Sequence, residues 1–143
     1  MPPSTPTGWT AAEAEIAFAR AVRSRRRASL ARRVLRRCVE CARLAVFEGH
    51  AFGGGRRGVR EIPLDAIAGS LEPQRAADFD GEFRPSPRTR RRWLSVWVAE
   101  QRRAVLPPIA VVAIGDAYAI RDGHHRVSVA RARGALTISA VVA

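Results

Sequence analysis

The residues best suited to chemistry are the consecutive Asp122, Gly123, His124, His125 and Arg126. An aspartate-glycine pair interrupts regular structure, and the residues that follow have a helical composition that ends at a glycine, a natural helix stop. The sequence therefore predicts a strand, a tight turn and a helix. The first amide groups of such a helix lack partners and lie at the positive end of its dipole, so the turn is suited to holding a phosphate group.

Each residue of the turn has an expected role. Gly123 has no Cβ and lets a ligand approach the backbone, whereas Arg126 offers a planar fork of donors to phosphate oxygens. His125 is expected to hold phosphate as well, and Asp122 to orient the turn or a metal ion. Replacing Arg126 by Ala should then abolish phosphate binding. The alternative is structural: Asp122 caps the helix, Gly123 makes the turn, and the two histidines bond to the backbone.

The chain here resembles the ParB/sulfiredoxin superfamily. The matching segments are Tyr118-Ala-Ile-Arg-Asp-Gly-His-His-Arg126, Val129 to Gly134 and the closing strand Thr137 to Val142. In that superfamily the equivalent turn, G-E-R-R in ParB and G-C-H-R in sulfiredoxin, binds the phosphates of CTP or ATP. Residues 75–85 are also similar to segments of actinobacterial ParB-like proteins of unassigned role, which widens the resemblance to residues 59–143. The resemblance implies an α/β domain, with a small mixed sheet and flanking helices, that binds a nucleoside triphosphate.

Two departures limit what the resemblance implies about activity. His124 stands where sulfiredoxin has its catalytic Cys and ParB its Glu, which argues against sulfinic-acid reduction. Ser128 stands where the longer ParB motif has another Arg, which weakens the transfer of ParB's CTP-driven clamp. The resemblance then implies a nucleotide-dependent switch in a DNA-associated system such as chromosome partitioning, with slow hydrolysis as an option. An ATP-dependent kinase of small hydroxyl compounds is an alternative, because a D-G-H-x-R form occurs in ParB-related serine kinases.

A second cluster contains Asp78, Asp80 and Glu82, which alternate with Phe79 and Phe83. In an extended segment the three carboxylates would share one side. They are then catalytic candidates, as a general base or as ligands for the Mg²⁺ of a bound triphosphate. The alternative is an exposed acidic loop anchored by the two phenylalanines, with its carboxylates paired to arginines. ParB-like domains are often labelled nucleases, but apart from these carboxylates no residues here are suited to a nuclease mechanism.

The formal net charge of +12 arises from 25 basic residues, all of them arginine. Such a surface attracts phosphate-bearing partners without choosing among them. The candidates for contact with DNA or RNA lie on the predicted N-terminal helix and are Arg32, Arg33, Arg36 and Arg37. A solvated helix face is the alternative, and the helix is also a candidate surface for a homodimer or a partner protein. A non-enzymatic DNA-binding module is therefore a second hypothesis for the whole chain.

No metal site is predicted. Cys38 and Cys41 form one C-x-x-C pair, but zinc usually needs four ligands, and only His50 is near in sequence as a third. A redox pair is expected at a helix start beside a strand, whereas this pair lies within a predicted helix. Both cysteines are expected to be small core or interface residues.

The predicted organisation has four parts: an unstructured lead (1–9), a basic helical arm (10–48), a glycine-rich linker (49–58) and the α/β domain (59–143). The arm begins at an N-cap, Thr10, with Glu13 at capping-box spacing, and its apolar stripe includes Leu30 and Val34. In the domain, strands are predicted at 59–64, 109–114, 117–121 and 137–142. A helix from residue 86 to residue 100 places two tryptophans, Trp93 and Trp97, in the core. The chain has neither a long apolar run nor a signal-peptide pattern, so a cytoplasmic protein without membrane association is expected, with nucleoid association as an option if DNA is bound.

Overall fold

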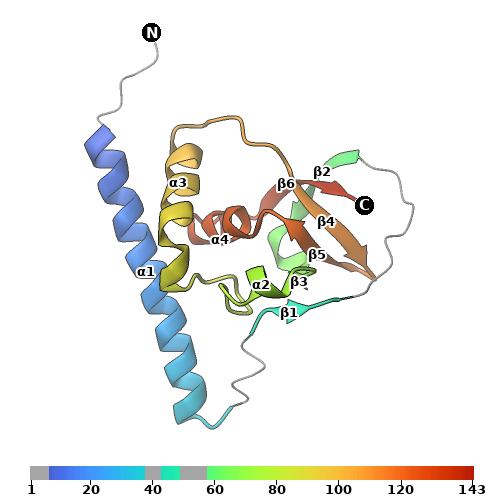
Figure 1. Ribbon diagram of the computed structural model, residues 1–143, viewed down its shortest axis with the longest axis horizontal. Coiled ribbons are helices and arrows are strands. Elements are labelled where there is room, and N and C mark those ends of the chain that lie inside the picture. The colour runs from blue at the N-terminus through green and yellow to red at the C-terminus, as the bar shows by residue number, and fades with distance from the viewer. Residues whose placement is uncertain (1–6, 38–42, 49–57) are drawn as a thin grey trace.

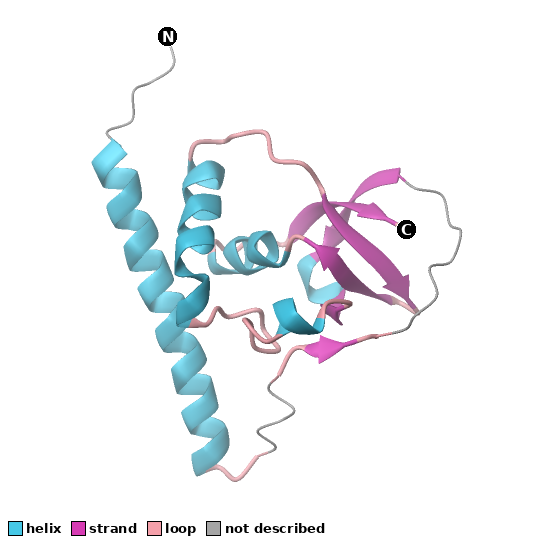
Figure 2. Ribbon diagram, viewed as in Figure 1, coloured by secondary structure: helices cyan, strands magenta, loops and turns pink. Residues whose placement is uncertain are grey.

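The computed structural model describes residues 7–37, 43–48 and 58–143, which form a mixed six-stranded sheet with helices on its flank (Figures 1 and 2). The fold class predicted from the sequence, an α/β domain with a small mixed sheet, is confirmed. The helices are α1 (Thr7–Val34), α2 (Pro73–Ala76), α3 (Arg90–Gln101) and α4 (His124–Ala132), with 3-10 turns η2 (Leu64–Ala66) and η3 (Pro87–Thr89). The strands are β1 (Ala45–Val46), β2 (Gly58–Pro63), β3 (Ile67–Ser70), β4 (Ile109–Ile114), β5 (Ala117–Asp122) and β6 (Thr137–Val142).

The sheet has the order β1-β3-β5-β4-β6-β2. The pairs β1/β3, β3/β5 and β4/β6 are parallel, and the pairs β4/β5 and β2/β6 are antiparallel. The predicted strands 109–114 and 117–121 are present as β4 and β5, which form a hairpin around Gly115 and Asp116. Strand β2 lies at an edge, as expected for a strand that ends at a proline. Strand β3 was not predicted, and it turns out to be the neighbour of β5.

The helices stack outward from the sheet in the order α4, α3 and α1 (Figure 1). Both predicted tryptophans are buried, and Trp93 is completely so. Its ring lies 5.4 Å from that of Phe18 on α1, and its Nε1 donates a 2.9 Å hydrogen bond to the Ser128 hydroxyl on α4. One side chain therefore joins three helices.

Replacing Trp93 by Ala is expected to lower the free energy of unfolding by about 3 to 5 kcal/mol, because it leaves a large cavity and removes the donor for the buried Ser128 hydroxyl. Urea unfolding measures this loss. Trp9 is the matched control because it lies on α1 with 71% of its surface exposed. Trp9→Ala should change the free energy by no more than about 0.5 kcal/mol, and equal losses in the two variants would show that Trp93 is not a joining residue.

Helix α1 is shorter than predicted and packs through a different face. It begins at Thr7 and ends at Val34, so Thr10 is a buried helical residue rather than the N-cap. The predicted stripe residues Leu30 and Val34 are exposed. The residues that pack on α3 lie earlier in the helix, at steps of four, and are Ala14, Phe18 and Val22.

The end of α1 has a clear local cause. Arg36 has φ of +52°, its amide donates to the Arg33 carbonyl, and the Arg37 amide donates to the Arg32 carbonyl. This is the bonding pattern of a Schellman cap, in which one residue adopts the left-handed conformation and terminates the helix. An arginine at that position gives no sequence signal, since glycine usually occupies it.

Helix α1, the described part of the predicted arm, packs along α3, and its Glu15 pairs with Arg90. Cys38, Cys41, His50 and the glycine-rich stretch from 53 to 55 lie outside the described residues. In the described part of the chain, no helix is long and apolar enough to cross a membrane.

Candidate functional site

The predicted turn lies where two parallel strands end. Strand β5 ends at Asp122, and α4 begins at His124 after Gly123. Beside it, β3 ends at Ser70, which pairs with Ile120, and the Leu71 amide donates a 2.8 Å hydrogen bond to the Ile120 carbonyl. Each strand leads into a helix. The carboxyl ends of parallel strands are the usual place for ligands in open α/β sheets.

Gly123 is required at the turn for two reasons. Its φ is +114°, and a Cβ at this position would come within 2.4 Å of Cγ2 of Ile109. It is also the N-cap of α4, so no side chain of the N-cap residue satisfies the amides of the first helical turn. Asp122 is exposed and belongs to β5, which excludes the cap role that the structural alternative gave it.

His124 is held by a side chain rather than by the backbone. It is buried, with Nε2 2.5 Å from the Ser70 hydroxyl, and its ring stacks on Phe79 at 6.2 Å. The Ser70 oxygen accepts the Glu72 amide at 2.9 Å, and its hydroxyl also lies 3.3 and 3.5 Å from the carbonyl oxygens of Glu72 and Ile120, so Nε2 of His124 is the shortest of its side-chain contacts. Ser70 is fully buried, and the pair therefore fixes the start of α4 instead of presenting a nucleophile to a substrate.

His125 is also buried, and its ring meets Phe79 edge-on at 5.3 Å. Burial, followed by the charges of Arg92 and Arg75, lowers its pKa from 6.5 to about 4. Burial, followed by Arg75, lowers the pKa of His124 to about 4 as well. Both imidazoles are therefore neutral near pH 7. Each can still donate one hydrogen bond, since a neutral imidazole keeps one N–H.

Arg126 does not lie with the histidines. Its guanidinium is 3.9 Å from the Glu100 carboxylate on α3, and it lines a separate cavity of about 310 Å³ with Arg133 and Thr137. Residues two apart on a helix point in nearly opposite directions, so His124 and Arg126 occupy different faces of α4. The predicted phosphate role of the Arg126 side chain is thus not supported by its position.

Arg75 and Arg92 are the cations that sequence reasoning missed. They come from α2 and α3, and the charge of Arg75 acts on both histidines. Arg75 lies on α2, which follows β3 directly. It could have been identified as a site residue only if β3 had been predicted as the neighbour of β5. Arg92 belongs to a run of arginines in which the sequence singles out none.

The three predicted catalytic carboxylates lie in a loop of turns, not in an extended segment, so they do not form one row. The Asp80 carboxylate accepts the amides of Glu82 and Arg84 at 3.0 and 2.8 Å, which closes the turn. Phe79 and Phe83 are buried beneath it. Each carboxylate also has a guanidinium partner: Asp78 with Arg88, Asp80 with Arg84, and Glu82 with Arg131. This arrangement matches the second interpretation of the sequence, an acidic loop that is anchored by two phenylalanines and whose carboxylates pair with arginines.

Two other predictions concern metal and nucleic acid. Within residues 7–37, 43–48 and 58–143, no group of three or more His, Cys, Asp or Glu side chains could hold a metal ion. The four arginines proposed for nucleic acid do not share a face, because Arg32 lines a cavity against the body and the others are exposed to solvent: Arg33, Arg36 and Arg37.

Comparison with known proteins gives one structural similarity. No family model matches the sequence, and no curated protein matches it. A sulfiredoxin from Arabidopsis thaliana, known from its crystal structure, resembles the chain with a TM-score of 0.44 and 19% identity. The similarity covers 60% of this chain and 84% of that one.

Proposed function

We propose that the protein binds a nucleoside triphosphate, CTP or ATP, with its phosphates over Gly123 at the start of α4. The observation that carries the proposal is the glycine N-cap at the carboxyl ends of the parallel strands β3 and β5. Backbone amides of the first turn of α4 then bind phosphate oxygens, and the helix dipole adds to the attraction. The ParB-like character of residues 118–126 makes a nucleotide-dependent switch the proposed role.

The cations of this proposed site are Arg75 and Arg92 rather than Arg126. Both act electrostatically on His125, and both are exposed, so a ligand can reach them. His125 contributes the N–H of a neutral imidazole. Arg126 instead joins α4 to α3 through Glu100. Mg²⁺ would enter with the triphosphate, held mainly by phosphate oxygens and by the exposed Asp122 carboxylate, in the way Mg²⁺ usually binds phosphate ligands.

The proposed function is binding without a chemical step. Asp78, Asp80 and Glu82 are each paired with arginine, which leaves no carboxylate of the loop positioned as a base. Sulfinic-acid reduction is also left out, because position 124 carries a buried histidine where that reaction needs a thiol.

Calorimetric titration with CTP, ATP and GTP, with and without Mg²⁺, tests the proposal. One nucleotide is expected to bind selectively. Arg75→Ala should weaken this binding by about 10- to 100-fold, because a hydrogen bond to a charged group contributes about 1.5 to 3 kcal/mol. Arg60→Ala is the matched control, since it removes the same charge from β2, at the edge of the sheet.

Arg126→Ala separates the two assignments of the phosphate cation. With Arg75 and Arg92 in that role, its effect should be smaller than that of Arg75→Ala. A complete loss of binding only in Arg126→Ala would return the role to Arg126. Absence of heat with all three nucleotides, in a protein whose unfolding is cooperative, would overturn the nucleotide proposal.

A further inference from the structure

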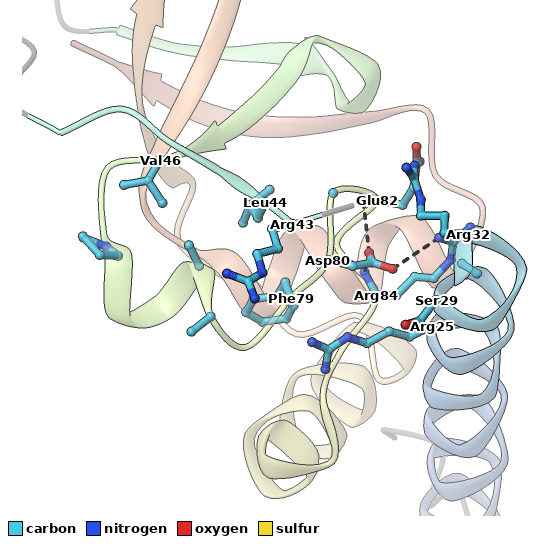
Figure 3. A pocket seen from close by; sticks show the side chains of 15 residues that line it. Arg25, Ser29, Arg32, Arg43, Leu44, Val46, Phe79, Asp80, Glu82 and Arg84 are labelled. Atoms are coloured by element: carbon cyan, nitrogen blue, oxygen red, sulfur yellow. Dashed lines mark hydrogen bonds and ion pairs between the residues drawn. The ribbon is translucent and has the colours of Figure 1, made fainter. Parts of the chain in front are cut away.

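A second basic site lies in a groove between the C-terminal half of α1 and the body of the protein (Figure 3). Its volume is about 660 Å³. One wall carries Arg25, Ser29 and Arg32 of α1, and the other carries Arg43, which precedes β1, together with Arg84. No residue of α4 lines the groove, which adjoins the proposed nucleotide site only through Phe79 and α2.

The groove arises because one face of α1 is apolar in the first part of the helix and polar and basic further along. Ala14, Phe18 and Val22 pack this face on α3. Further along, Arg25, Ser29 and Arg32 continue the same face at helical spacing, but they meet a cavity instead of an apolar core. The groove is therefore lined by arginine and serine where the first half of the same face is apolar, which makes it a candidate site for an anion.

The acidic residues of the groove are already engaged. Asp80 pairs with Arg84 and accepts two backbone amides, and Glu82 pairs with Arg131. In the described part of the chain, no ion pair engages Arg25 or Arg43. Because the carboxylates that line the groove are already paired, Arg25 and Arg43 leave positive charge in it, which favours an anion.

The kind of anion follows from the surface beyond the groove. Residues 16–37 contain nine arginines and no acidic residue. Those on the outer side of α1 are exposed, including Arg26, Arg27 and Arg33. The positive surface therefore extends out of the groove along the helix, which suits a polymer with a charge on every unit better than one small anion or a short acidic peptide.

We propose that this groove binds the phosphate backbone of single-stranded nucleic acid, with Arg25 and Arg43 contacting phosphates from opposite walls. We expect a flexible single strand to enter the groove, and a stiff duplex to contact mainly the outer face of α1. The floor residues Leu44 and Phe79 are buried, so bases have no exposed aromatic ring to stack on. Binding is accordingly independent of base sequence.

Fluorescence anisotropy with a short labelled oligothymidylate tests the proposal across about 50 to 200 mM salt. The double variant Arg25→Gln, Arg43→Gln should bind at least about tenfold more weakly than the wild type. Its logarithmic salt dependence should be shallower by about 0.7 for each phosphate that the protein no longer neutralises. Arg43→Glu is a second variant whose folding is not at risk, because the side chain is exposed, and it should weaken binding further.

The double variant Arg60→Gln, Arg121→Gln removes the same charge from residues that do not line the groove. Its affinity for the oligonucleotide should fall by less than about twofold. An equal loss of affinity in both double variants would overturn the proposed groove site, because it would show that the overall positive charge of the protein binds the oligonucleotide. Polyglutamate of matched charge should displace the oligonucleotide poorly; efficient displacement would identify an acidic protein partner instead. Duplex DNA that binds more tightly than the single strand, and without regard to Arg25 and Arg43, would also overturn the proposal.

Discussion

Lowering the pH from about 7 to about 4 is expected to lower the free energy of unfolding by a few kcal/mol, because each unit of pKa difference between the folded and unfolded states corresponds to about 1.4 kcal/mol. His124 and His125 have pKa values near 4 in the folded protein and near 6.5 when exposed. The cause is burial against Phe79, reinforced by Arg75 for both rings and by Arg92 for His125. A loss of a few kcal/mol is a large fraction of the stability of a typical domain.

The sign follows from which state binds protons. Between pH 6.5 and 4 the unfolded chain protonates both histidines and the folded chain does not, so stability falls as the pH falls through this window. Above pH 6.5 both states are neutral at these rings, and the two histidines cause no pH dependence. Asp78 and Asp122 act in the opposite direction but are weaker than burial and the arginines.

Urea unfolding at a series of pH values measures the effect, and a pair of variants isolates it. His125→Phe keeps an aromatic ring against Phe79 and removes one titrating group, so it should lose about half of the slope between pH 4 and 6.5. Adding His124→Gln, which retains a partner for the Ser70 hydroxyl, should remove most of the remainder. If the double variant kept the wild-type slope, carboxylates rather than these histidines would be responsible.

The strands and helices near the C-terminus could be predicted because their limits are encoded locally. Strand β4 follows Pro107 and Pro108, Gly115 and Asp116 form the hairpin turn, and Gly134 ends the last helical segment with φ of +76°. Each of these signals is a property of one or two residues and does not depend on the rest of the fold.

Strand β3 could not be predicted because its stability comes from its neighbours. Its sequence Ile-Ala-Gly-Ser is short, and small residues favour no strand. A Cβ on Gly69 would come within 2.3 Å of the Ala45 carbonyl oxygen, so this glycine serves the close approach of β1. That requirement arises from a residue far away in sequence, which a local pattern does not contain.

The candidate site was predictable in position but not in composition. The turn itself lies where the sequence places it, with Gly123 as the residue that the backbone requires. The direction of Arg126 depends on where α3 packs, and the contribution of Arg75 depends on the unpredicted β3. Side chains that reach a site from other elements are set by tertiary packing, which one sequence segment cannot report.

Gly123→Ala is expected to lower the free energy of unfolding by about 2 to 5 kcal/mol and to abolish the proposed nucleotide binding. The left-handed backbone conformation costs a residue with a Cβ about 1 to 2 kcal/mol, and the contact with Ile109 adds about 1 to 3 kcal/mol of overpacking. Two glycines separate these causes. A Cβ would meet nothing within 4 Å at Gly58, and the same is true at Gly115, where φ is +58°.

Gly58→Ala should therefore be nearly neutral, and Gly115→Ala should show the backbone cost alone. Combining Gly123→Ala with Ile109→Ala should cost less than the sum of the two changes, since the second removes the Cγ2 atom that the new methyl group meets. Additive losses would mean that the turn relaxes without contacting Ile109. The Gly123→Ala variant could instead be as stable as Gly115→Ala and still fail to bind the nucleotide. Glycine would then be needed at this position for the close approach of phosphate rather than for folding.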